Sequence, residues 1–158
     1  MIQDSYKLTA SEALDAFASG RLSSVELVKS CIGQIKATDD RIKAWAFLDG
    51  NVALAQAEEC DRIRKAGLAT GALHGIPVGL KDIIDTAKMP TQCGTPIFSG
   101  RRTDHVARLV ERLREAGAII LGKTVTTELA FVHANETRNP HNPDHSPGGS
   151  SSGSAAAV

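Results

Sequence analysis

The chain has 158 residues, of which 42% are hydrophobic and 23% charged, as in one ordinary globular domain. Its 18 basic residues balance 18 acidic ones, which excludes a protein that attracts nucleic acid through a strong positive field. No apolar run approaches the roughly 18 residues of a membrane span, and we expect no secretory signal in the opening residues. The three cysteines, Cys31, Cys60 and Cys93, are odd in number and far apart, which fits reduced thiols in a cytoplasmic protein.

Helical signals dominate the first 70 residues. Two capping boxes, Thr9–Glu12 and Ser23–Glu26, predict the starts of two helices. Apolar residues recur at helical spacing behind each box, and Gly20 is a natural end for the first helix. A third helix is expected over about residues 52–66. The short apolar run 44–48 between the second and third helices predicts a buried strand.

The second half of the chain alternates strands with a helix and loops. Residues 76–80 and 118–121 are predicted strands, whereas residues 86–102 contain several Pro and Gly and are expected to be mostly loop. Thr103 is expected to cap a strongly amphipathic helix that ends at Gly117. Helices that alternate with short buried strands predict an α/β fold with a mixed central sheet covered by helices.

Two apparent ligand motifs are expected to be false. Residues 117–124, GAIILGKT, match the phosphate-loop pattern, but their inner Ala-Ile-Ile-Leu favours a strand over a glycine-rich nest. The histidines share no metal-ligand spacing, so we expect no metal site and place them at the surface or in loops. They are His74, His105, His133, His141 and His145.

Two segments leave a functional and a structural alternative open. Lys81 follows an apolar strand, so it is either a partly desolvated base or, as spacing alone favours, a lysine whose ammonium reaches water. Residues 148–154, GGSSSGS, fit a linker, a phosphate cradle or a strained loop that presents a serine. Composition alone favours the linker, although the segment runs directly into Ala155–Val158, which resembles the start of a buried helix.

Five stretches taken together and in order resemble the amidase signature family. They are GIPVGLKD at 75–82, MPTQCGT at 89–95, AGAIILGKT at 116–124, TRNP at 137–140 and PGGSSSGSAAAV at 147–158. The resemblance spans most of residues 8–158. It implies that the chain is the N-terminal portion of a single amidase-signature domain, with residues 1–70 as a mainly helical lead-in and 71–158 as the start of the catalytic core.

The resemblance implies an enzyme that cleaves linear carboxamides with a Ser–Ser–Lys triad and without a cofactor, a lysine-based relative of the serine–histidine arrangement. Lys81 resembles the ultimate base, and Ser150 resembles the bridging serine that follows a cis peptide bond in the family. Ser151 and Gly149 are candidate supporting residues beside them. Phe131 resembles a position that lines the acyl pocket in some members.

In the family, the nucleophilic serine and the oxyanion hole lie further along than Val158. We therefore expect a chain truncated at its C-terminus and inactive by itself, since losing an oxyanion hole alone costs about 10²–10³ in rate. One alternative is a protein like the A subunit of glutamyl-tRNA amidotransferase, and another is a non-catalytic binding fragment. The expected partners are a small-molecule amide and a second copy or a missing C-terminal remainder, with no direct nucleic-acid or membrane contact.

Overall fold

The computed structural model describes residues 4–158; residues 1–3, part of the opening stretch in which we expect no signal, lie outside the described residues. The chain divides into two compact units, which are described separately. The first unit comprises the chain up to Ala37, Asp49–Val78 and Glu111–Leu121. The second comprises Thr38–Leu48, Gly79–Val110 and Gly122–Val158. The expected division at residue 70 stays a prediction.

Both predicted capping boxes form. A short 3-10 helix, η1 (Ser5–Lys7), precedes α1 (Ala10–Ala18), where the Thr9 hydroxyl accepts from the Glu12 amide and the Glu12 carboxylate accepts from the Thr9 amide. The same exchange between Ser23 and Glu26 opens α2 (Ser24–Ile42). Each box satisfies amides that a helix start leaves without partners.

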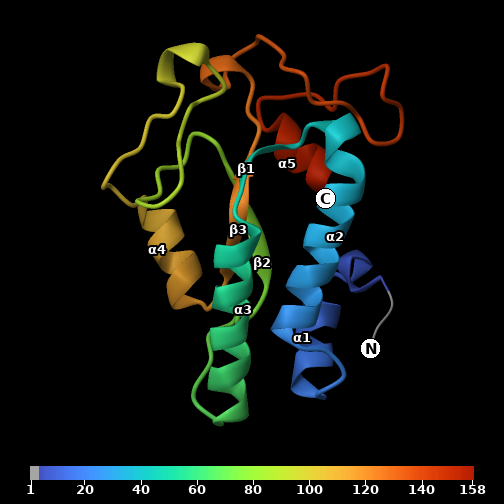
Figure 1. The fold of residues 1–158 in the computed structure, drawn as a ribbon, viewed down its shortest axis with the longest axis vertical. Helices are drawn as coiled ribbons and strands as arrows, with labels where there is room; N and C mark the ends of the chain where they lie inside the picture. The colour runs from blue at the N-terminus through green and yellow to red at the C-terminus, as the bar shows by residue number, and fades with distance from the viewer. Residues whose placement is uncertain (1–3) are drawn as a thin grey trace. The chain divides into compact units, whose positions relative to one another are not determined.

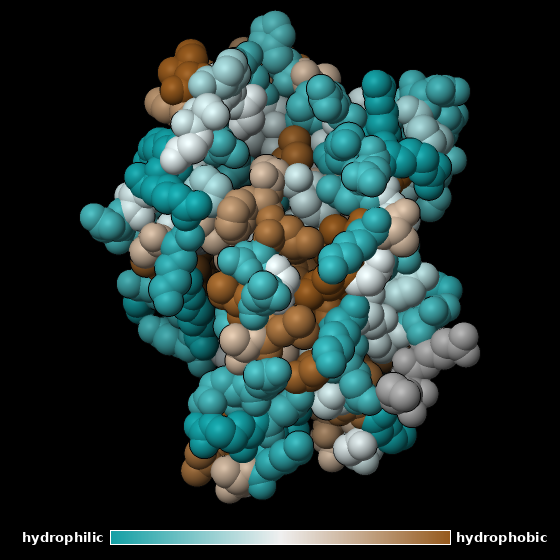
Figure 2. Space-filling view, in the orientation of Figure 1, coloured by the Kyte–Doolittle hydropathy of each residue, from teal (hydrophilic) through white to brown (hydrophobic). Residues whose placement is uncertain are grey.

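The core of the first unit forms where the apolar faces of the early helices meet the start of the second strand. Its buried members are Ala13, Ala16, Phe17, Leu22, Leu27 and Ile76. The third helix, α3 (Gly50–Lys65), is capped by Asp49, and its buried Asp61 accepts from the first two amides of α2 at 2.8 and 3.1 Å. Figure 2 shows apolar residues at the surface between α2 and α3. Within the first unit, Val52 of α3 is 42% exposed and Leu68 is 56% exposed.

The three predicted strands form one mixed sheet. They are β1 (Trp45–Leu48), β2 (Pro77–Lys81) and β3 (Ile119–Thr124), in the order β1–β3–β2 (Figure 1). Strand β1 is antiparallel to β3, with Trp45 opposite Thr124. Amide-to-carbonyl bonds from Ile119 to Ile76 and from Asp82 to Thr124 place β2 and β3 parallel. The expected α/β class with a mixed sheet is confirmed.

Strand β3 is buried along its whole length and includes Gly122, Lys123 and Thr124. The last three letters of the phosphate-loop match therefore lie in the sheet and not in a loop of free amides. The predicted strand in this segment is confirmed, and the absence of phosphate binding stays a prediction.

One sequence prediction differs from the structure. Helix α4 (Arg108–Glu115) begins five residues after Thr103, whose hydroxyl accepts from the amide of His105 in a local turn. The amide of Ala107, just before α4, donates to the carbonyl of Asp85. His74 lies in a turn as expected but is buried, with Nε2 2.9 Å from the Cys60 carbonyl oxygen, whereas the other four histidines are exposed.

The remaining elements are short. They are the 3-10 turns η2 (Pro96–Phe98) and η3 (Glu128–Ala130) and the helix α5 (Ser152–Ala157). Helix α5 packs on β1 through Ala156, which shares a small core with Ile42 and Ala44. Among residues 4–158, no helix combines the length and the apolar character that crossing a membrane requires.

Candidate active site

The second unit brings together the side chains of Lys81 and Ser150, which are 69 residues apart in the sequence. Lys81 is the last residue of β2, and its Nζ lies 2.6 Å from the Ser150 Oγ. Both residues are half-buried. This is hydrogen-bonding distance, within which a proton can pass between a hydroxyl and an amine. Lys81 therefore faces a hydroxyl, and its role as a base stays a prediction.

The backbone around Ser150 is held by the residues that follow β3. The Ser150 carbonyl oxygen accepts from the Thr127 amide at 2.9 Å and from the Thr126 hydroxyl at 3.1 Å. The Gly149–Ser150 peptide bond is cis. A Cβ atom on Gly149 would lie only 2.7 Å from the Thr127 Cγ2, so the close approach of these two segments requires glycine.

The Gly/Ser segment is an ordered part of the fold and not the linker that composition alone favours. Ser151 stands at the N-cap of α5, where its carbonyl accepts from the amide of Ala155. A Cβ atom on Gly153 would collide with the backbone of Ala44 and Val125. The backbone of α5 thus packs directly against the end of the sheet, which a larger residue would prevent.

A second, fully buried lysine lies beside the first. Lys123 is 0% exposed, and its Nζ contacts the Asp82 Oδ1 at 3.0 Å, the Pro90 carbonyl at 2.9 Å and the Thr91 Oγ1 at 2.8 Å. Burial lowers the pKa of Lys123 from its ordinary value, and the Asp82 carboxylate opposes that shift. No sequence motif pointed to this pair. The signal that could have found it is a lysine inside an otherwise apolar strand.

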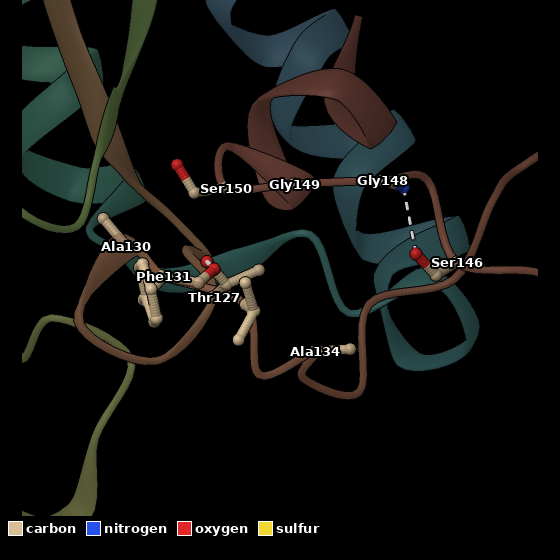
Figure 3. Close-up of a pocket in the computed structure, with 9 residues that line it drawn as sticks. Thr127, Ala130, Phe131, Ala134, Ser146, Gly148, Gly149 and Ser150 are labelled. Carbon is tan, nitrogen blue, oxygen red and sulfur yellow. Dashed lines mark hydrogen bonds between the residues drawn. The ribbon is translucent and has the colours of Figure 1, made fainter.

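A cavity of about 510 Å³ opens beside Ser150. Figure 3 shows Thr127, Ala130 and Phe131 on one segment of its wall, and Gly148, Gly149 and Ser150 on another. The other lining residues are Val132, Ala134 and Ser146. Phe131 is 73% exposed, so its ring is available to a molecule in the cavity.

The cavity wall carries no ionisable side chain, so it offers hydroxyls, backbone groups and apolar surface to a ligand. Within the part of the chain that the structure describes, no three His, Cys, Asp or Glu side chains gather where they could hold a metal ion. The chemistry that these residues can perform is therefore proton transfer between Lys81 and Ser150 beside an uncharged cavity.

The sequence of residues 26–158 matches the Amidase family. The chain therefore belongs to the amidase family, as the sequence motifs predicted.

Curated relatives and solved structures agree with this assignment. The A subunit of glutamyl-tRNA(Gln) amidotransferase from Chloroflexus aggregans is 42% identical over 157 residues, which cover 96% of this chain and 32% of that protein. The native peptide amidase from Stenotrophomonas maltophilia superposes with a TM-score of 0.89 and 40% identity, over 99% of this chain and 35% of that one. A bacterial aryl acylamidase of the amidase signature family gives 0.88 and 27%, over 96% and 33%. The chain spans about a third of the length of the curated relatives it matches.

Proposed function

We propose that the chain supplies the lysine base and the bridging serine of a site that cleaves linear carboxamides. The observation that carries the proposal is the 2.6 Å contact between the Lys81 Nζ and the Ser150 Oγ. Phe131 lines the acyl side of the cavity in this proposal. Gly149 allows the close packing of the serine loop, and Ser151 stands beside Ser150 as a second hydroxyl.

The proposed relay moves one proton in two transfers. Neutral Lys81 accepts the hydroxyl proton of Ser150 as the Ser150 oxygen accepts the proton of a nucleophilic serine, whose oxygen attacks the amide carbon. The proton then returns along the same path to the leaving amine. The family resemblance assigns the nucleophile to neither Lys81 nor Ser150, so the 158-residue chain alone is expected to leave amides intact.

A second candidate is a component of an amidotransferase. Relatives named as the A subunit of glutamyl-tRNA(Gln) amidotransferase reach 42% identity, slightly above the 40% of the peptide amidase. Such a protein releases ammonia from an amide and passes it to a tRNA-linked acid together with partner proteins. Glutaminase activity and co-purified partners of the complete gene product would favour this candidate. A non-catalytic binding fragment is the third possibility.

The proposal includes a small-molecule amide as the ligand and no direct contact with nucleic acid or membrane. It also includes either self-association or association with a C-terminal remainder, and a cytoplasmic location. The three cysteines are free thiols, which supports a reducing compartment.

A chimeric enzyme tests the proposal. Residues 1–158 replace the matching part of the Stenotrophomonas maltophilia peptide amidase, and amide hydrolysis is measured for the parent chimera and for single variants. Lys81→Ala and Ser150→Ala should each lower turnover by about 10²–10⁴-fold, the usual contribution of a positioned proton acceptor. Lys88→Ala, at an exposed lysine seven residues away, is the matched control and should leave turnover unchanged.

The purified 158-residue chain provides the other half of the test. It should show no hydrolysis of an aryl amide or a peptide amide. Hydrolysis by this chain that Ser150→Ala abolishes would contradict the proposal, because Ser150 would then be the nucleophile. Near-parental turnover of the Lys81→Ala chimera would equally refute the role of Lys81.

A further inference from the structure

We propose that the buried Lys123–Asp82 pair is a positioning device that fixes Lys81 against Ser150. The inference rests on the proposed function, because it assigns a role at the same site. Asp82 follows Lys81 directly in the sequence, and Lys123 belongs to the neighbouring strand β3. Neither member of the pair touches Ser150 in the hydrogen bonds described above, so the pair acts through Lys81.

Asp82 is held at four atoms. Its amide donates to the Thr124 carbonyl at 2.9 Å, and its carbonyl accepts from the Cys93 amide at 2.9 Å. One carboxylate oxygen accepts from the Gln92 amide at 3.1 Å, and the other accepts from Lys123 at 3.0 Å. The residue that follows Lys81 is thereby held through both its backbone and its side chain, which restricts where the Lys81 side chain begins.

Lys123 connects Asp82 both to strand β3 and to the loop at residues 90–91. Its three contacts, with Asp82, the Pro90 carbonyl and the Thr91 hydroxyl, use all three of its N–H donors. The ammonium therefore connects strand β3 to Asp82, which follows β2, and to the loop at residues 90–91. No further donor of the group is left for a ligand, which makes a purely positional role the chemistry that fits.

The same stretch of chain also anchors Ser150. One residue beyond Lys123, the Thr124 hydroxyl lies 2.7 Å from the Ser154 hydroxyl in α5. Further along, the Thr126 hydroxyl and the Thr127 amide hold the Ser150 carbonyl. Residues 123–127 thus serve as a common reference for both reacting groups, and the pair supplies the Lys81 half of that reference.

A buried ion pair is weak support for stability, because well-packed apolar residues in its place are often as stable. The pair can still matter for the position of Lys81. Proton transfer depends on hydrogen-bond contact, and small displacements of the reacting groups reduce its rate strongly. An apolar replacement of both partners therefore separates the two roles. It can keep the fold and the backbone bond from residue 82 to Thr124 while removing the side-chain contact between residue 82 and β3.

Lysine labelling in the full 158-residue chain tests the inference without an activity assay. The chain is acetylated with an amine-reactive ester, and mass spectrometry gives the rate at Lys81 relative to the exposed Lys88. Labelling is done at about pH 11, above the usual lysine pKa, so that access and hydrogen bonding set the ratio. In the unaltered chain Lys81 should then react more slowly than the exposed Lys88, because Lys81 is half-buried and its Nζ lies 2.6 Å from the Ser150 Oγ. In the Lys123→Met/Asp82→Leu variant this ratio should rise roughly five- to tenfold, the change expected when one hydrogen bond is lost.

Val28→Ala is the matched control. Val28 is fully buried in the first unit, so the substitution should weaken the fold and leave the labelling ratio at Lys81 unchanged. Circular dichroism identifies variants that keep the native secondary structure. Should the double variant not fold, Asp82→Asn decides instead, because it keeps the shape and weakens the contact with Lys123; the ratio should then rise about twofold or more.

The outcomes separate the two proposals. Equal labelling of Lys81 and Lys88 in the unaltered chain would contradict the Lys81–Ser150 contact and with it the proposed function. Slow labelling of Lys81 that persists in a folded double variant would overturn the positioning role alone. A rise of the same size in Val28→Ala would also overturn it, because the effect would then follow general loosening of the fold.

Discussion

Replacing Lys123 with methionine should be among the most damaging single substitutions in this chain. The change keeps an unbranched side chain of similar length but removes the ammonium that faces the buried carboxylate of Asp82. Asp82 is 2% exposed and would retain the Gln92 amide as a partner for one carboxylate oxygen. Breaking a buried pair by removing one partner typically costs about 3–5 kcal/mol. This is a large share of the roughly 5–15 kcal/mol that stabilises an ordinary domain.

Urea denaturation followed by circular dichroism at pH 7 measures this loss. Lys7→Met is the matched control, because Lys7 lies 2.9 Å from the carboxylate of Asp4 but both side chains are more than half exposed. Solvent screens such a pair, so the control should leave the unfolding midpoint unchanged. Adding Asp82→Leu to Lys123→Met should recover most of the lost free energy of unfolding. A loss below about 1 kcal/mol for Lys123→Met alone would refute the reasoning, because a buried carboxylate would then tolerate the loss of its partner.

Three further predictions concern other parts of the chain. Gly153→Ala should lower the free energy of unfolding by about 1–3 kcal/mol, since the new methyl group would collide with the backbone of Ala44; an unchanged urea midpoint would contradict this packing. Burial raises the pKa of the Cys31 thiol to about 11, so its alkylation rate should still be climbing between pH 9 and 11, and a plateau by pH 9 would count against that burial. The Arg101 guanidinium holds the pKa of Asp85 below its usual value, so this carboxylate stabilises the fold above that usual value and the gain disappears as the pH falls through the lowered pKa. Arg101→Gln should accordingly lower the thermal midpoint at pH 7, by an amount that shrinks as the pH falls and Asp85 becomes protonated; a loss that does not change with pH would show that the ion pair is not its cause.

Local signals predicted most of the secondary structure. The capping boxes at Thr9 and Ser23 form because a hydroxyl and a carboxylate three residues apart satisfy each other's amides without outside help. Thr103 carries a similar signal, yet its hydroxyl closes a local turn and the helix begins at Arg108. The amide of Ala107 bonds to Asp85, a contact between residues far apart in sequence that no local pattern contains.

The candidate site shows the same difference between local signals and long-range contacts. Spacing alone favoured a solvated Lys81, and only the family resemblance linked it to Ser150. The pairing of Lys123 could not be predicted from the sequence because its partner, Asp82, is 41 residues away. His74 lies in a turn, as predicted, but its burial could not be predicted, because its acceptor is a backbone carbonyl that no sequence motif records. Long-range polar contacts are therefore what the sequence alone could not provide.

The claim that Lys81 and Ser150 act as one relay is tested most directly by combining their substitutions. In the peptide amidase chimera, turnover is measured for Lys81→Ala, for Ser150→Ala and for the double variant. Groups that act as a unit are strongly non-additive, so the double variant should be about as slow as the slower single variant. If the two losses instead multiply, the residues contribute independently, and the relay through their 2.6 Å contact would be contradicted.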